Sequence, residues 1–171
     1  MTEKLVKTRK RVADVGEVFT PRWLVDEVIE TLPESLFEDP HKTFIDPTCG
    51  DGNFLVVVLE QKVLRGSHPL QALLTIHGVD IMPDNVIECR QRLFVTVTTF
   101  IDLDYSRERN LFKKFVKRRT LKRIQRALRS NIQHGDTLRF DIEDIFSSSP
   151  SKELLNFRNK KDDISELDSG G

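Results

Sequence analysis

The amino-acid sequence predicts an α/β fold, an abbreviated sheet with flanking helices. Residues 43–46 (TFID) form a short apolar run that ends in an acid, as is typical of a buried strand. A turn built on Pro47 and two glycines follows. Residues 53–65 then carry an apolar run long enough for a buried helix, which Gly66 ends. A strand, a glycine turn and a helix start in this order predict a corner where free backbone N–H groups face a nucleotide-like ligand.

The glycine turn also limits the kind of ligand. Gly50 and Gly52 are its glycines, and neither the spacing G-x-G-x-x-G nor the sequence G-K-[ST] is present there. Those two patterns serve pyrophosphate and triphosphate ligands. The turn therefore disfavours both classes of ligand.

A second strand is expected over residues 73–80 (LLTIHGVD), which again ends in an acid. An acid at this place can accept hydrogen bonds from both hydroxyls of a ribose, and Ile81 beside it can pack on an adenine ring. Asp80 can equally cap the helix that follows, and the two roles are compatible. His77 lies inside the strand, so we expect it to pack rather than to catalyse.

The other elements follow from local signals. Residues 20–21 (TP), with threonine as the cap and proline as the first helical residue, predict a helix that Pro33 stops. A long helix begins at Pro83 or Asp84. The β-branched residues 95–99 leave a strand as an alternative there, but we expect helix because no breaker intervenes. Residues 33–42 are expected to form a polar linker, and residues 131–136 a short strand. Residues 138–145 alternate weakly and are expected to form a last strand.

Four short motifs carry a resemblance to a known family. They stand at residues 16–21 (GEVFTP), 46–54 (DPTCGDGNF), 78–81 (GVDI) and 135–138 (GDTL). Together and in this order, they resemble the cofactor motifs of the amino-methylating DNA methyltransferases, in particular the adenine-specific ones. The resemblance covers roughly residues 15–140. It implies a Rossmann-like class I methyltransferase fold and S-adenosylmethionine as the cofactor.

The resemblance also implies roles for single residues. Residues 16–21 would fold back over the cofactor, with Thr20 bonding its methionine carboxylate. Asp136 would accept a hydrogen bond from the adenine amino group, and a turn aspartate is the alternative. Cys49 is expected to be a small packing residue rather than a reactive thiol, because no histidine is obviously paired with it. The implied cofactor-binding residues are Phe19, Thr20, Pro21, Asp46, Pro47, Cys49, Gly50, Gly52, Asp80, Ile81 and Asp136.

One family motif is missing. The family places an Asn/Asp-Pro-Pro-Tyr/Phe tetrapeptide on the strand after the one that bears Asp136, and the chain contains no such tetrapeptide. Residues 146–150 (FSSSP) lie near that place, but serines cannot supply the same acceptors beside a stacking ring. The catalytic residues therefore stay unknown, and the catalytic groups would come from a protein partner or a divergent loop.

Two classes of function remain, and we favour the first. The first is a small adenine-specific DNA methyltransferase, of the compact kind that viral genomes carry. The second is a catalytically incomplete module that binds S-adenosylmethionine and nucleic acid as a regulatory or specificity subunit. Methylation of RNA or protein is a third, weaker alternative.

Charge is distributed unevenly along the chain. Lys plus Arg and Asp plus Glu both number 27, so the formal charge is zero. Within residues 107–129 a single acid, Glu108, opposes a long series of cations along an apolar stripe of helical spacing. This predicts one amphipathic helix, or two short ones, with a basic face that is either solvated or binds DNA. The expected nucleic-acid-binding residues are Lys113, Lys114, Lys117, Arg118, Arg119, Lys122, Arg123 and Arg126.

The chain is expected to hold one domain between two polar ends. Residues 1–14 form a basic arm, either solvated or in contact with phosphates; residues 15–146 form the methyltransferase-like domain; residues 147–171 form a weakly ordered tail. Its two cysteines cannot by themselves form a disulfide framework or a zinc site, and no metal is expected. No apolar leader or span is present, which favours a cytoplasmic protein without membrane contact.

Overall fold

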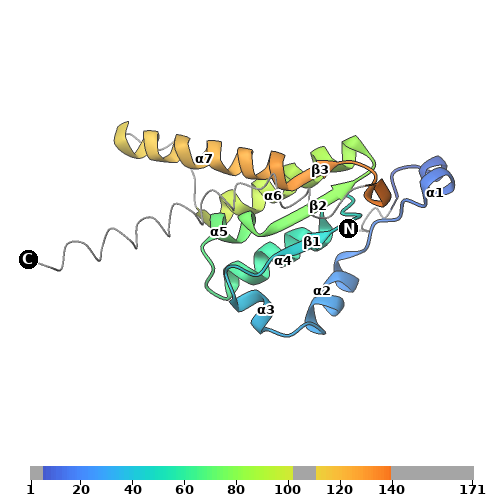
Figure 1. Cartoon of the computed structure of the whole chain (residues 1–171), viewed down its shortest axis with the longest axis horizontal. Coiled ribbons are helices and arrows are strands. Elements are labelled where there is room, and N and C mark those ends of the chain that lie inside the picture. Colours follow the sequence, from blue (N-terminus) through green and yellow to red (C-terminus); the bar gives the residue numbers. More distant parts are fainter. Residues whose placement is uncertain (1–5, 102–110, 140–171) are drawn as a thin grey trace, which may run out of the picture.

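The structure, a computed structural model, describes residues 6–101 and 111–139 of the chain (Figure 1). Its centre is a sheet of three parallel strands in the order β1-β2-β3. The strands are β1 (Phe44–Asp46), β2 (Ile76–Asp80) and β3 (Ile132–His134). The predicted α/β fold is thus confirmed as a small parallel sheet flanked by helices.

The register brings the carboxyl ends of the strands to one edge of the sheet. Asp46 lies opposite Gly78 in the first pair, and Asp80 lies opposite His134 in the second. In open α/β sheets, ligands bind outside this edge. The strand ends therefore define where a site is expected.

Two helices lie side by side against the sheet. Helix α4 (Asn53–Leu64) follows β1, and α6 (Pro83–Ile101) follows β2. Right-handed crossovers between parallel strands in sequential order place both helices on the same face. Helix α4 also packs against α2 (Arg22–Glu30) and α5 (Pro69–Leu74), so it is sandwiched as its apolar run predicts. Its buried residues lie all around the helix: Asn53, Leu55, Val56, Val57, Val58, Leu59 and Lys62.

A buried lysine ties the outer face of α4 to the loop before β1. The Lys62 ammonium donates hydrogen bonds to the backbone carbonyls of Asp39 at 3.1 Å and Lys42 at 2.6 Å. Burial lowers the pKa of Lys62 to about 8. The loop also contains a helix that the sequence did not predict, α3 (Ser35–Glu38), within the expected linker at residues 33–42.

Two predicted element starts are wrong. The second strand begins at Ile76 rather than at residue 73, because α5 continues to Leu74. Proline in the first turn and the His68 side chain, which accepts from the N–H of Leu70, set the start of that helix. In α2, Pro21 occupies the cap position and no side chain caps the helix, so the predicted threonine cap is wrong as well.

Helix α6 runs without a break through residues 95–99, so the helical alternative is confirmed. Its threonines direct their hydroxyls back along the helix. The hydroxyls of Thr96 and Thr98 donate to the carbonyls of Arg92 and Phe94, at 3.0 and 2.7 Å. This local bonding lets threonine remain in a helix despite its preference for strands.

The basic segment forms one long helix, α7 (Leu111–Asn131), which leads directly into β3. The helical prediction is confirmed over residues 111–129, whereas residues 107–110 lie outside the described part. At its carboxyl end, the Arg90 side chain donates to the carbonyls of Ile132 and Arg129. Because Arg90 belongs to α6, these hydrogen bonds join the carboxyl end of α7 and the start of β3 to α6.

Both ends of the described chain differ from expectation. The first end forms a short helix, α1 (Arg9–Val15), where residues 1–14 were expected to be an irregular arm. The other end is a 3₁₀ turn, η1 (Thr137–Arg139), at the start of the expected last strand. Residues 140–145 of that strand and the predicted tail at 147–171 lie outside the described residues. Among the described helices, none is long and apolar enough to cross a membrane.

Candidate cofactor site

The glycine turn is fastened to the end of β2 by backbone groups. The N–H of Cys49 donates to the carbonyl of Val79 at 2.9 Å, and the N–H of Gly50 donates to the Asp80 carboxylate at 2.9 Å. The turn closes on itself through a 2.8 Å hydrogen bond from the N–H of Gly52 to the carbonyl of Cys49. These bonds bring the motifs at residues 46–54 and 78–81 into one unit.

Asp80 is the centre of this unit. Besides Gly50, its carboxylate accepts from the N–H of Met82 at 2.8 Å and from the Asn85 amide at 3.2 Å. A carboxylate has about four acceptor positions, so three donors leave about one for a ligand. The bond to Met82, the residue before α6, shapes the turn into that helix, but the N–H groups of Asn85 and Val86 bond the Met82 carbonyl, so Asp80 is not the predicted helix cap.

Only glycine fits at position 52. Its φ of 86° lies in the left-handed region, and a Cβ atom there would lie 2.6 Å from the sulfur of Cys89. Cys49 is buried in the same turn, where a hydrogen bond with the Cys89 thiol and burial raise its pKa well above the ordinary value. The Cys49 sulfur is therefore a protonated packing group, as expected, and not a nucleophile.

Two adjoining cavities open at this edge of the sheet. The larger has a volume of about 720 Å³, within the range of small-molecule sites. It is lined by Gly16, Glu17, Val18, Phe19, Thr20, Pro47, Thr48, Gly50, Asp80, Ile81, Met82, Asn85, Asp136, Thr137 and Leu138. The smaller, of about 200 Å³, is lined by Val18, Phe19, Thr20, Asp46, Thr48, Cys49, Gly50, Asp51, Asn53 and Phe54.

Most of the predicted cofactor residues meet in these cavities. The larger contains Phe19, Thr20, Pro47, Gly50, Asp80, Ile81 and Asp136. Asp46 and Cys49 line the smaller one. Pro21 and Gly52 line neither of the two and act through the backbone, at the start of α2 and in the glycine turn.

The lining of both cavities is acidic. Five carboxylates contribute to it: Glu17, Asp46, Asp51, Asp80 and Asp136. Among the residues that the structure describes, no lysine, arginine or histidine lines either cavity. Burial raises the pKa of Asp46 above its ordinary value, and the nearby Asp80 carboxylate raises it further. Arginines outside the lining pair with Glu17, Asp51 and Asp136, so Asp46 and Asp80 contribute most of the negative charge that favours a cationic ligand over a phosphorylated one.

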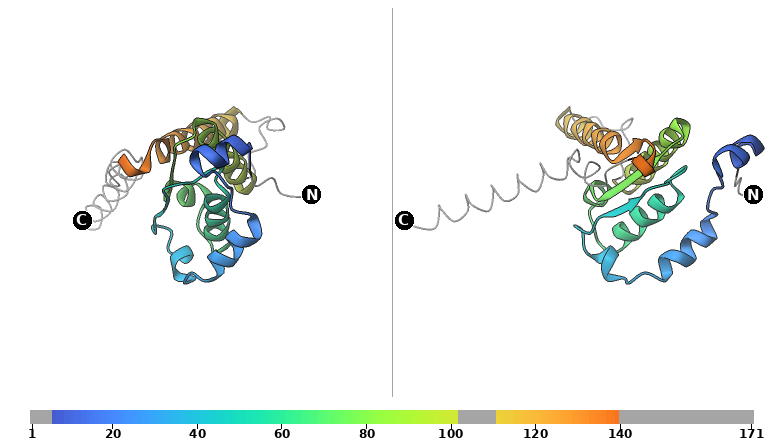
Figure 2. Two further views of the ribbon diagram at one scale, coloured as in Figure 1. Left: turned by 90° about the vertical axis from the view of Figure 1, so that its right-hand side faces the viewer. Right: turned by 45° about the vertical axis from the view of Figure 1, so that its right-hand side comes forward.

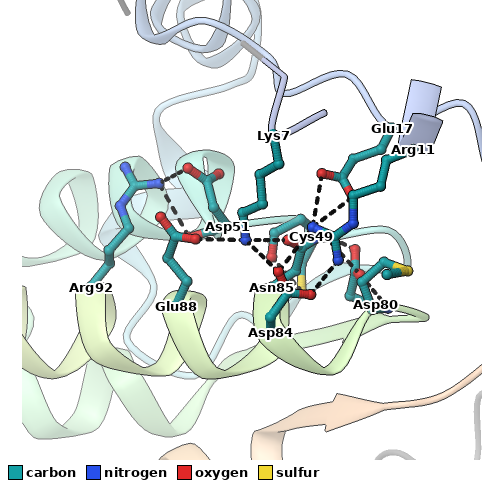
Figure 3. A network of polar contacts seen from close by, with 12 residues as sticks. Lys7, Arg11, Glu17, Cys49, Asp51, Asp80, Asp84, Asn85, Glu88 and Arg92 are labelled. Carbon is teal, nitrogen blue, oxygen red and sulfur yellow. Dashed lines mark hydrogen bonds and ion pairs between the residues drawn. The ribbon is translucent and has the colours of Figure 1, made fainter. Parts of the chain in front are cut away.

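Residues 7–20 form a strap that reaches α6 through Lys7 and Arg11 (Figure 3), and its residues 16–20 line the larger cavity. The Lys7 ammonium contacts the carboxylates of Asp84 at 3.0 Å and Glu88 at 2.8 Å. Arg11 bonds Asp84 at 2.9 Å, and this bond together with the one from Lys7 holds the pKa of Asp84 below its ordinary value. These ion pairs contradict, for Lys7 and Arg11, both the solvated and the phosphate-contacting arm.

Glu17, in the same strap, lies inside the cavity wall. Its side chain is only 7% exposed and its Oε2 atom, 3.4 Å from the Arg11 guanidinium, accepts no hydrogen bond from the described residues. Phe19 follows it and covers the glycine turn, since a Cβ on Gly50 would lie 3.3 Å from the Phe19 ring. Lys7 in turn lies 5.6 Å above the centre of that ring.

Asn53 and Arg92 connect the strap to the glycine turn. The Asn53 amide donates to the carbonyl of Thr20 at 2.8 Å, and Arg92 donates to the Asn53 side-chain oxygen. Arg92 also pairs with Asp51 at 2.6 Å (Figure 3). Since Asn53 is the first residue of α4, this bridge holds Thr20 beside the start of the helix.

Sequence analysis missed Glu17, Asn53 and Asn85. Glu17 and Asn53 stand inside the motifs at residues 16–21 and 46–54 but were given no role there. A further local signal lies in α6, where Asp84, Glu88 and Arg92 recur every four residues and so form one polar stripe. That stripe meets both the strap and the glycine turn (Figure 3). It could have indicated a polar contact surface, but not its partners.

The last motif closes the other side of the cavity. Asp136 accepts from the N–H of Leu138 at 3.1 Å and pairs with Arg139 at 3.3 Å, as a turn aspartate does. The Thr137 hydroxyl donates to the carbonyl of Pro47, which ties this turn to the glycine turn. Ile81 is half exposed at the mouth, at 52%. Asp136 thus has the predicted turn role and a place in the cavity wall.

The predicted nucleic-acid residues lie on α7. Arg118, Arg119, Lys122, Arg123 and Arg126 are exposed, and Lys117 is half-buried. The side chains of Lys113 and Lys114 lie outside the described part. Within the described residues, no cluster of histidine, cysteine, aspartate or glutamate could hold a metal ion.

Comparison with known proteins agrees with the cavity and its motifs. The family model described as N-6 DNA Methylase matches residues 3–111, more than half of the chain. The searches of the curated proteins and of the solved structures found no match to the chain. The matched stretch contains the strap, the glycine turn and Asp80, and it ends where α7 begins. The chain therefore belongs to the N-6 DNA methylase family.

Proposed function

We propose that the chain binds S-adenosylmethionine in the acidic cavity and serves the methylation of adenine in DNA. The observation that carries this proposal is a lining with five carboxylates, of which Asp46 and Asp80 make no ion pair among the described residues. S-adenosylmethionine has a positive sulfonium and a positive ammonium beside one carboxylate. An acidic pocket suits that charge and rejects dinucleotides and nucleoside triphosphates.

The cavity residues divide between the parts of the cofactor. Asp80 takes a ribose hydroxyl, Ile81 supports the adenine ring, and Asp136 accepts from the adenine amino group. Asp80 has about one acceptor position left beside its three described bonds, and it would hold the ribose hydroxyl there. Thr20 and the backbone of the glycine turn hold the methionine end, beneath Phe19.

Glu17 fits the cationic part of the cofactor. Its buried Oε2 atom accepts no hydrogen bond from the described residues, and Glu17 lines the larger cavity. A buried carboxylate oxygen without a donor is costly unless a ligand supplies one. The methionine ammonium supplies such a donor.

The cofactor, when bound, supplies an activated methyl group on a sulfonium. The chain's own residues hold and orient it, and the covered cavity excludes water. Acceptors for the hydrogens of the target amine do not follow from any motif in this chain, because the expected tetrapeptide is missing. A protein partner that extends the sheet into the full class I methyltransferase fold would complete the active site.

A second candidate function rests on that missing tetrapeptide. In this alternative the chain binds S-adenosylmethionine and DNA but transfers nothing, as a regulatory or specificity subunit. The basic face of α7 serves DNA binding in both alternatives.

The test is transfer of isotope-labelled methyl from S-adenosylmethionine to unmodified DNA, with RNA in parallel. Label recovered in N6-methyladenine, and lost in Asp80→Ala, supports the enzyme. Intact cofactor binding with no label in either polymer supports the binding module. Label in RNA alone contradicts the choice of DNA.

A further inference from the structure

Helix α7 lies far from the cofactor cavity. Its basic face therefore has to be considered as a DNA-binding surface separate from the site of methyl transfer. The three strands point their carboxyl ends at the cavity, whereas α7 enters β3 from the opposite edge of the sheet (Figure 1). Figure 2 shows α7 continuing roughly along the line of β3, away from α1. The exposed cations of α7 therefore do not surround the place where methyl transfer is proposed.

The separation can be estimated from standard geometry. Strand β3 advances about 3.3 Å per residue from Ile132 towards Asp136, and α7 advances about 1.5 Å per residue from Lys122 to Asn131. Together these segments place Lys122 and Arg126 about 20–30 Å from Asp136. Along a DNA duplex, that distance corresponds to about 6–9 base pairs.

The face itself has the composition of a phosphate-binding surface. Among residues 117–131, whose side chains the structure describes, the exposed ones are Arg118, Arg119, Lys122, Arg123, Gln125, Arg126 and Arg129. No acid occurs anywhere in α7. Arginine and lysine bind phosphates and can also contact guanine, and none of these exposed residues is aromatic and able to stack on an unpaired base.

Several of these cations have no competing partner. In the part of the chain that the structure describes, Lys122, Arg123 and Arg126 make no ion pair. Ile124, Ala127 and Leu128 on the other side of the helix are buried, which fixes the cationic side towards solvent. The charges are thus held in a row rather than spread around a mobile segment.

We infer that α7 is a distal anchor, which binds the phosphate backbone of a DNA duplex about 20–30 Å from the cofactor cavity, a span of about 6–9 base pairs. The inference rests on the proposed function for the identity of the polymer. It assigns to α7 affinity and orientation of the duplex, and no contact with the target base. Phosphate contacts position a duplex and carry no sequence information.

The test measures duplex binding by fluorescence anisotropy over a series of salt concentrations. Two unrelated 24-base-pair duplexes are compared for the wild-type chain and for a variant with Lys122→Gln, Arg123→Gln and Arg126→Gln. The wild type should bind both duplexes within about twofold, and the variant should lower the slope of log K against log salt by up to about 3. A control with Arg22→Gln, Lys42→Gln and Arg65→Gln removes the same charge from positions outside both α7 and the basic arm and should leave the slope unchanged.

Three outcomes would overturn the anchor. In the first, the α7 variant keeps the wild-type slope of log K against log salt. In the second, the control variant lowers that slope by the same amount. In the third, polyglutamate displaces the duplex at equal concentration of charge, which would point to an acidic protein as the partner. Calorimetry with S-adenosylmethionine on the same variants separates this failure from failure of the proposed function. The α7 variant should keep the wild-type affinity for the cofactor, and loss of cofactor binding in the wild type would contradict the proposed function alone.

Discussion

The Asp80 carboxylate accepts a 2.9 Å hydrogen bond from the backbone N–H of Gly50, across 30 residues of sequence. This bond joins the end of β2 to the turn that follows β1. The motifs at residues 46–54 and 78–81, which both lie within the family match, are therefore one physical unit. A change at Asp80 acts on the ligand and on the turn together.

Asp80→Asn is expected to weaken S-adenosylmethionine binding by at least about tenfold, because a loss of about 1.4 kcal/mol already has this effect. The variant keeps the size of the side chain but removes its charge and replaces one acceptor with a donor. Calorimetric titration measures the loss, and circular dichroism checks that the fold is kept. Asp14→Asn, at an exposed carboxylate of α1, is the control and should bind as the wild type does. Equal affinity of the two variants would contradict the assignment of Asp80.

Gly52→Ala is expected to lower the free energy of unfolding by about 2–5 kcal/mol. About 1–2 kcal/mol comes from the left-handed backbone, and about 1–3 kcal/mol from overpacking against the Cys89 sulfur. Gly66→Ala is the matched control, because Gly66 has a φ of 97° but nothing within 4 Å of the added Cβ. It should lose only the backbone part. Equal losses in urea unfolding would show that the turn does not pack on Cys89 as described.

The strap is expected to respond to salt. No described side chain of α1 is buried, so ion pairs and hydrogen bonds hold it to α6. Lys7→Gln with Arg11→Gln should speed amide exchange at residues 16–20, while unfolding changes by less than about 1 kcal/mol because surface ion pairs contribute little. Wild-type chain in about 1 M salt should exchange at a similarly raised rate.

Lys10→Gln is the control for the strap, since Lys10 is exposed in the same helix. In this control variant, the amide exchange rate at residues 16–20 should equal that of the wild type. If the double variant exchanged no faster than this control, the strap would be held by something other than these ion pairs.

His77 should make stability depend on pH between 4 and 6.5. Burial lowers its pKa from 6.5 to about 4, so the unfolded state binds the proton first as the pH falls. The free energy of unfolding therefore decreases from pH 6.5 down to pH 4, by at most about 3 kcal/mol, and changes no further below that. The difference between the wild type and His77→Gln isolates this contribution from that of the acids. If the difference in the free energy of unfolding between the two proteins did not change between pH 4 and 6.5, the lowered pKa of His77 would be contradicted.

The glycine turn, the strand ends and the long basic helix could be predicted because each depends on neighbours in sequence. The start of β2 could not, since Leu73 and Leu74 are apolar and suit a buried helix as well as a strand. Only the proline at the start of α5 favoured helix there. Helix α3 was missed because its segment, Ser35–Glu38, is too short to show the spacing of apolar residues that is typical of a helix.

The strap and the inner carboxylate were missed for a different reason. Lys7 and Arg11 meet partners 73 to 78 residues away, and no local pattern reports such a contact. Asn53 and Asn85 are polar residues whose roles come only from what the fold brings near them. The residues that the family motifs supplied were found, and the residues that orient those motifs required the structure.

The most direct test of the account is calorimetric titration of the wild-type chain with S-adenosylmethionine, beside ATP at the same concentrations. Both ligands carry adenosine, but only the first is cationic at its other end. An acidic cavity predicts binding of S-adenosylmethionine with one site per chain, and no binding of ATP. Absence of heat with S-adenosylmethionine, or equal binding of ATP, would contradict the assignment of the cavity.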